Sequence, residues 1–231
     1  MRVLIIVLAL LFTACSGVEK GHYVIEGKSY DEGSYYYLFR ADKMVDSALV
    51  TNGQYRFEGI VEEQLPIRNI SSTSLRDPFV PARFTQVILE DSGIIKVCED
   101  DNSPTGKLKV TGTKANNTLY NFSIEATRYH EAMRSCADRE KRAEYMSKYI
   151  ELVKQTVYDN LDNFAGVFMF TLSSTRFTEQ EREDILKRVS PKMQKTEAIK
   201  QLSRKEQTLK SMRQLKNTKI EEAEIKENIK K

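Results

Sequence analysis

Three cysteines carry the most distinctive chemistry in this chain. Cys15, Cys98 and Cys136 are widely spaced, and no Cys-x-x-Cys pair occurs. A cysteine can carry a lipid, form a disulfide or, as a thiolate, act as a nucleophile beside positive charge. His22 and His130 stand alone, without further ligands at the spacing of a metal site. Because there is also no nucleophile elbow and no glycine-rich phosphate loop, we expect no catalytic set, no metal and no other cofactor.

Cys15 closes an N-terminal segment that is typical of an export signal. Arg2 precedes an apolar run at residues 3–12, and a small pair ending in Ala14 follows. The run is shorter than the roughly 20 residues that a membrane-spanning helix needs. The segment resembles a bacterial lipobox, which implies cleavage after Ala14 and a lipid on Cys15. We therefore expect a lipid-anchored protein of the cell envelope, and Ser16 favours the outer membrane, on its periplasmic or surface face.

Cys98 and Cys136 are the thiols that remain once Cys15 is assigned to the lipid. An exported chain can form disulfides, but nothing in the spacing requires one. Cys98 ends a predicted strand, whereas Cys136 falls on an apolar helical stripe, where we expect a buried and unreactive thiol. A bond between them needs Cα atoms within about 7 Å, so a structural disulfide and two free thiols both stay open.

The first half of the mature chain has the character of a β domain. Short runs rich in Val, Ile, Tyr and Phe alternate with turns. Asn52-Gly53 predicts a hairpin with a type I′ turn, because both central residues of that turn need positive φ. Parallel pairing would need crossover helices that do not fit between these runs, so we expect antiparallel pairing in a sandwich or partly open barrel. About eight strands are predicted, at residues 23–27, 35–39, 45–50, 55–61, 66–70, 84–89, 94–98 and 107–110.

The second half has helical periodicity. Apolar residues recur every three or four positions after Gly112, and Thr178 with Glu181 has the spacing of a capping box. The first predicted stripe contains Leu119, Phe122, Ala126, Tyr129, Met133 and Cys136, and the second contains Met146, Tyr149, Ile150, Val153, Val157 and Leu161. The fold class is therefore α+β. The expected organisation is a signal peptide at 1–14, a lipidated tether at 15–21, a β domain at 22–113, a helical region at 114–190 and a basic, helical tail at 191–231.

Composition limits the class of partner. The 231 residues carry a net charge of +3, with 40% hydrophobic and 30% charged residues and no Trp. This suits a body with a modest core and gives no reason to expect nucleic acid as a partner. Basic residues gather from Lys192 onward. This basic stretch could touch anionic headgroups or a partner helix, but a solvated, partly frayed helix is the favoured interpretation.

Tyr35-Tyr36-Tyr37 is the remaining candidate for binding, because tyrosine combines apolar area with a polar tip. The favoured alternative is an ordinary strand whose central Tyr36 faces the core while its neighbours face outward.

Several segments together resemble a known family, the domain of unknown function that precedes the thioredoxin-like domain in many Bacteroides-type lipoproteins. They are Val45-Asp46-Ser47-Ala48, residues 52–59, Val87-Ile88-Leu89-Glu90, and Val110-Thr111-Gly112-Thr113 with Asn116-Asn117. The resemblance covers residues 23–122, with a family-like helical stretch to residue 189. In such proteins a thioredoxin-like domain with a Cys-x-x-Cys pair follows. That pair is absent here, so the oxidoreductase activity of the family is not expected.

The leading expectation is therefore a lipid-anchored, non-catalytic binding or interaction module of the envelope. The membrane, through Cys15, and an envelope protein are the expected partners. Two alternatives stay open: an auxiliary component of a thiol-disulfide system with a thioredoxin-like partner, in which Cys98 and Cys136 would matter, and a truncated remnant of a longer protein.

Overall fold

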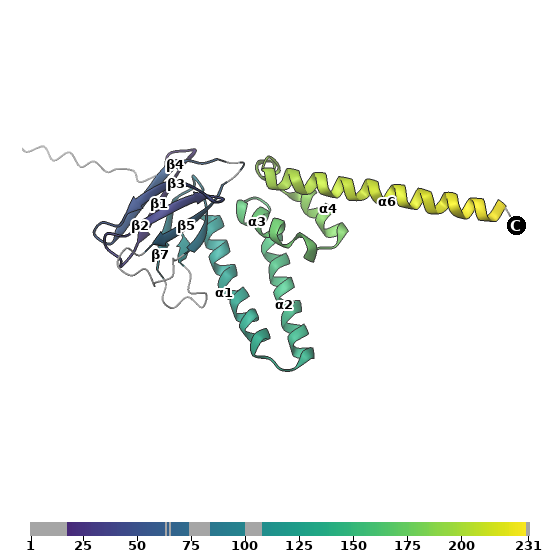
Figure 1. Ribbon diagram of the computed structural model, residues 1–231, viewed down its shortest axis with the longest axis horizontal. Helices are drawn as coiled ribbons and strands as arrows, with labels where there is room; N and C mark the ends of the chain where they lie inside the picture. Colours follow the sequence, from purple (N-terminus) through teal and green to yellow (C-terminus); the bar gives the residue numbers. More distant parts are fainter. Residues whose placement is uncertain (1–17, 63, 65, 74–83, 100–107, 230–231) are drawn as a thin grey trace, which may run out of the picture.

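The computed structural model describes residues 18–62, 64, 66–73, 84–99 and 108–229, apart from the side chains of residues 217 and 219–229. Within these ranges, eight strands are followed by a set of helices, and the strands form two separate sheets (Figure 1). Cys15 lies outside the described residues. The lipid on Cys15 therefore stays a prediction.

Each sheet has four strands, and each of the eight predicted runs is a strand. The first sheet has the order β4 (Gln54–Ile60), β1 (His22–Lys28), β7 (Ile94–Cys98), β8 (Lys109–Thr111). The second sheet has the order β3 (Lys43–Leu49), β2 (Tyr35–Arg40), β5 (Ile67–Thr73), β6 (Phe84–Ile88). The predicted α+β class with a β-sandwich is confirmed, and the sheets do not close into a barrel.

One pairing differs from the expectation of antiparallel strands throughout. β1 and β7 run parallel, with Val24 opposite Ile94 and Lys28 opposite Cys98. The connection between them needs no helix, because the chain forms all four strands of the second sheet, and β4 of the first, before it reaches β7. The expectation considered only direct connections between neighbouring strands and therefore missed this connection.

The turn at Asn52-Gly53 has the predicted geometry, but the hairpin ends almost at once. Asn52 has φ 54° and Gly53 has φ 71°, and Thr51 and Gln54 exchange two backbone hydrogen bonds. Beyond this bridge, β3 joins the second sheet and β4 joins the first. The predicted pairing of the two long arms is wrong, since each arm pairs with another strand. The turn is a corner between the sheets.

Aromatic rings stack on one another inside the sandwich. The rings of Tyr36 and Tyr55 lie 3.9 Å apart between centroids at an interplanar angle of 11°. Tyr36 is 1% exposed, which confirms that the central tyrosine of its strand faces the core. A Cβ at Gly27 would overlap the Tyr55 ring, and one at Gly59 would come within 3.0 Å of the Tyr23 ring. Glycine is needed at Gly27 because the ring occupies the place of a side chain.

The helices begin directly after β8 and form a second body beside the sandwich (Figure 1). α3 is apolar on almost every side and lies at its centre, which explains why its sequence lacks helical amphipathicity. The capping box at Thr178 and Glu181 is confirmed at the start of α4. The helices are α1 (Lys114–Ser135), α2 (Arg139–Tyr158), α3 (Phe164–Ser173), α4 (Glu179–Arg188), α5 (Pro191–Gln194) and α6 (Glu197–Ile229).

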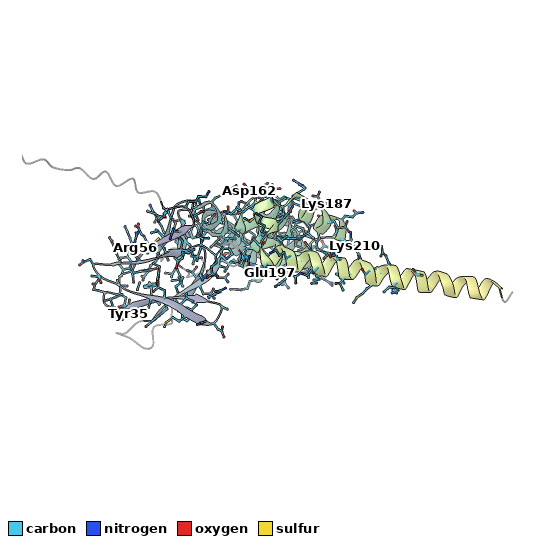
Figure 2. All side chains as sticks on the ribbon, turned by 90° about the horizontal axis from the view of Figure 1, so that it is seen from above. Tyr35, Arg56, Asp162, Lys187, Glu197 and Lys210 are labelled. Atoms are coloured by element: carbon cyan, nitrogen blue, oxygen red, sulfur yellow. The ribbon has the colours of Figure 1, made fainter. Side chains whose placement is uncertain are left out.

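α6 is partly packed and partly free. Ile199 and Leu202 are buried in the helical core, and Glu206 accepts a hydrogen bond of 2.7 Å from Arg182 of α4. The helix then runs on past the other helices (Figure 2). The interpretation as a solvated tail is therefore wrong for its first turns, where a buried ion pair fixes it. Among the described residues, no helix is long and apolar enough to cross a membrane.

Candidate functional site

The outward residues of the second sheet form a row of aromatic rings, which we call the aromatic face. It consists of Tyr35, Tyr37 and Phe39 on β2, with Met44 and Leu49 beside them on β3. Ring centroids lie 6.1 Å apart between Tyr35 and Tyr37 and 6.4 Å apart between Tyr37 and Phe39. Side chains two residues apart on a strand point the same way, so this spacing follows from the strand itself.

The aromatic face is unusually exposed for apolar residues. Tyr35 is 37% exposed, Met44 53% and Leu49 46%. Together with Val45, they are four of the ten large hydrophobic side chains that are exposed among the described residues. A clustered apolar surface of this kind marks an interaction site more often than scattered exposed residues do.

Small polar residues border the row on its other side. Thr73 lies opposite Tyr35 in the ladder, Ser71 opposite Tyr37, and Asn69 opposite Phe39. The surface therefore combines flat apolar rings with hydroxyl and amide groups, an arrangement suited to an extended ligand. β3 is also an edge strand, so its outer backbone groups are not paired within the sheet.

The outward residues of the first sheet have a different character, and we call them the lysine face. Lys28, Lys96 and Lys109 project from β1, β7 and β8. The ladder places Lys28 and Lys109 on either side of Cys98, in one row. Arg56 lies on the same face, where it pairs with Glu26 at 2.7 Å. Figure 2 shows Arg56 and Tyr35 on opposite sides of the sandwich.

The structure keeps Cys98 and Cys136 apart as free thiols. Cys98 ends β7, whereas Cys136 follows α1, which is about 33 Å long at 1.5 Å per residue and leads away from the sheets (Figure 1). No disulfide joins them. Cys136 is half-buried, not buried as the helical stripe predicted, because α1 ends at Ser135 and its thiol faces the turn toward Asp138 at 3.4 Å.

The histidines stay outside any metal cluster. In the parts of the chain that the structure describes, no group of three His, Cys, Asp or Glu side chains could hold a metal ion. His130 is exposed, and its ring packs against Tyr149 at 4.7 Å between centroids.

A buried cation is the feature that sequence reasoning missed most clearly. Arg68 is 4% exposed inside the end of the sandwich, although its neighbours on the strand are apolar or small. Its guanidinium lies 3.3 Å from a Glu62 oxygen and donates a 2.9 Å hydrogen bond to the Ile67 carbonyl. Burial lowers the pKa of Arg68, and Glu62 opposes that effect. Strand alternation from Ile70 is the signal that could have placed it inward.

The joint between sandwich and helices is built from side-chain contacts to backbone groups. Asn116, which is 2% exposed, accepts a hydrogen bond from the Ile88 N–H at 2.9 Å and donates one to the Ile88 carbonyl at 2.7 Å. Glu90 accepts a 3.1 Å hydrogen bond from the Ala115 N–H at the start of α1, and Asn117 accepts one from Gly112 at 3.0 Å. A carboxylate at a helix N-terminus is favourable, so these contacts fix where α1 leaves the sheets.

Two apolar hollows lie where the helices meet the sandwich. One of about 270 Å³ is lined by Leu108 and Phe122 among others, and one of about 200 Å³ by Ile67 and Val167. Leu172 of α3, 67% exposed, borders both. Nothing in the structure shows what covers this surface.

The sandwich and its joint with α1 are similar to a known protein family. Residues 23–119 match a family described as "Domain of unknown function (DUF4369)". The matched segment takes in the strands of both sheets and the start of α1, in agreement with the resemblance seen in the sequence. Residues that carried the resemblance, Glu90, Gly112, Asn116 and Asn117, are those that join the sheets to α1. Comparisons with curated proteins and with solved structures give no match.

Proposed function

We propose that the protein is a non-catalytic binding module of the cell envelope, attached to the membrane through a lipid on Cys15, and that the aromatic face contacts an envelope protein. One observation carries this proposal. Tyr35, Tyr37 and Phe39 form a row of rings, with Tyr35 exposed and the other two half-buried, on the outer side of a sheet whose inner face already supplies the core.

The energetics favour a binding role for this row. Aromatic side chains expose a large area at a low cost in conformational entropy, so burying them against a partner is favourable. The same rings add little to the sandwich core because they lie on the outer side of the sheet. The rings that stack within the core are those of Tyr36 and Tyr55. A rigid sheet also holds the rings in place before a partner binds, which lowers the cost of association.

A photo-crosslinking residue at position 35, in cells that export the full chain, tests the contact surface. Tyr30 is the matched control, because it is a tyrosine with 85% exposure in the turn between β1 and β2, outside the row. We expect a discrete protein adduct from position 35 and none from position 30. Equal labelling from both positions, or no adduct from position 35, would contradict the proposal.

The anchor is tested separately by Cys15→Ala. The variant should lose lipid labelling and either leave the membrane fraction or stay unprocessed, because the thioether to lipid cannot form. Acyl chains contribute about 0.8 kcal/mol per buried CH₂, so loss of several chains releases a body that has only weak contacts with the membrane. Unchanged lipid labelling of the variant would exclude Cys15 as the attachment site.

A thiol-disulfide role is the second candidate, because Cys98 and Cys136 are both free and half-buried. In this account the partner is an envelope thioredoxin-like protein in its disulfide form: one thiolate of this chain attacks that disulfide, a mixed disulfide forms, and the partner's other sulfur leaves as a thiolate. Thiol titration of the folded protein separates the candidates. Rapid reaction of one thiol in the native state favours the redox role. If neither thiol reacts in the native state, the redox role is excluded.

A further inference from the structure

The lysine face lies within a groove large enough for a ligand. The groove has a volume of about 840 Å³, and strands of the first sheet supply most of its lining. Small-molecule sites commonly have volumes of about 300–1,000 Å³, so the groove has room for a ligand of ordinary size. The groove lies mainly over the first sheet, whereas the aromatic face lies on the second, and among the described lining residues Leu49 of β3 is the one that both surfaces share.

The described lining of the groove is strongly cationic. Lys28, Lys96, Lys109 and Arg56 contribute positive charge, and Glu26 is the one carboxylate among the described lining residues. Arg56 is paired with Glu26 at 2.7 Å and with Glu58 at 3.2 Å, so its charge is offset. The three lysines therefore dominate the charge that a ligand in the groove would meet.

The lysines have no carboxylate partners in the described part of the chain. No ion pair joins Lys28, Lys96 or Lys109 to an acid there, although surface cations on the helices are often paired, as Lys114 is with Asp162 at 2.8 Å. Lys109 instead lies over the Tyr120 ring, 5.2 Å from its centroid. Three like charges on adjacent strands repel one another, and a bound anion would relieve that repulsion.

The strand ladder sets the spacing of the charges. Neighbouring strands lie about 4.8 Å apart, so Lys28 and Lys109, which flank Cys98 from two sides, start about 10 Å apart at their Cα atoms. Lys96 lies one row further along β7. A single monovalent anion cannot meet all three ammonium groups, whereas a ligand with several charges can.

A buried phenol, Tyr55, lies on the inner side of the sheet beneath the groove. Tyr55 lines it, is 4% exposed, and its hydroxyl makes no hydrogen bond with the described residues. This hydroxyl therefore faces the interior, and the charge of the lysines is what the groove presents to a ligand.

We propose that the lysine face is a binding site for an oligoanion, a molecule with several phosphate or carboxylate groups that spans Lys28, Lys96 and Lys109. Cys98 lies at the centre of the lysine row, so a bound oligoanion covers its thiol. Cys136, at the far end of α1, stays uncovered. The reactivity of Cys98 therefore reports whether the groove is occupied, and the reactivity of Cys136 is an internal control.

The test measures how fast the neutral reagent N-ethylmaleimide alkylates each cysteine of the full-length protein, by mass spectrometry of the peptides that contain Cys98 and Cys136. Sodium tripolyphosphate and tricarballylate are the two probes, and sodium chloride at matched ionic strength is the control. We expect at least one probe to slow Cys98 several-fold and to leave Cys136 unchanged. Protection by tripolyphosphate alone identifies a phosphate ligand, and protection by tricarballylate alone identifies a carboxylate ligand.

Variants show whether the lysines are responsible. Lys28→Gln with Lys109→Gln should weaken the protecting probe by about tenfold, since two surface ion pairs together contribute about 1–2 kcal/mol. Lys187→Gln with Lys200→Gln removes the same charge from the helices and should leave protection unchanged. Failure of both probes to protect Cys98, or equal slowing of Cys136, would overturn the proposal, as would protection that survives Lys28→Gln with Lys109→Gln.

Discussion

The aromatic face and the lysine face are the two outer surfaces of one sandwich, and they carry opposite chemistry. Tyr35 and Tyr37 display flat apolar rings from the second sheet, whereas Lys28 and Lys96 display charge from the first. Both sheets have the same inner chemistry, since their inward residues merge into one apolar core. Side chains along each strand alternate between the inner and the outer side of the sheet. The inward residues therefore determine the stability of the sandwich, and the two outer faces are free to bind different partners.

The comparison requires that inward positions control folding. Gly27→Val should cause the largest effect, because its side chain would overlap the Tyr55 ring. We expect a loss of about 3 kcal/mol or more in the free energy of unfolding, as for other overpacked cores. Urea unfolding measures it, with Lys28→Val as the outward control on the same strand. Equal losses for both variants would mean that the two faces are not separable from the core.

A second inward position gives a pH-dependent signature. Burial raises the pKa of the Tyr55 phenol, with Tyr36 and Glu99 adding to the effect. Below pH 10 the tyrosine is neutral in both states, and above pH 10 the unfolded state releases a proton that the folded state keeps. Stability should therefore fall as pH rises above about 10, by up to about 1.4 kcal/mol per pH unit from this group.

Tyr55→Phe isolates that contribution. At pH 7 it should stabilise the protein by about 1 kcal/mol, because it removes a buried hydroxyl without a partner. Above pH 10 its advantage over the unmodified protein should grow. Thermal unfolding at pH 7 and pH 11 measures both effects, and a constant difference between the two pH values would show that Tyr55 is not protected from ionisation.

The aromatic face should matter less for folding than for binding. Tyr37→Ser should cost about 1 kcal/mol or less in unfolding free energy, because only ring contacts along and across the strands are lost. Crosslinking from position 35 should nevertheless disappear. A variant that unfolds, or one that retains full crosslinking, would remove the reason to treat this face as a contact surface.

The lysine face should have the smallest effect on stability. Lys28→Gln should change the unfolding free energy by no more than about 0.5 kcal/mol, since no ion pair in the described residues is broken. Relief of repulsion among the lysines could even make the change slightly stabilising. Chemical unfolding at low and at moderate salt checks the sign, and a large loss would indicate a structural role.

The sequence predicts local structure well and long-range pairing poorly. Alternation identifies all eight strands and the inward direction of Tyr36, and the Asn52-Gly53 turn has the φ angles expected of it. The same turn does not reveal that its arms belong to different sheets, because that depends on which strand arrives at each edge. The parallel pairing of β1 with β7 is hidden for the same reason.

The candidate surfaces were only partly visible in the sequence. Alternation along one strand predicts that Tyr35, Tyr37 and Phe39 share a face, but only the pairing with β3 brings Met44 and Leu49 beside them. The three lysines of the lysine face come from three strands that are distant in sequence, so no local sequence pattern predicts that they lie together. Cys136 was misplaced because a stripe of apolar residues does not say where a helix stops.

The most direct test of the account compares crosslinking from the two outer faces. A photo-crosslinking residue is placed at position 35 on the aromatic face or at position 96 on the lysine face, in the exported full chain. We predict a discrete protein adduct from position 35 and no protein adduct from position 96, where an oligoanion binds instead. The same protein adduct from both positions would contradict the division of the sandwich into two faces with different partners.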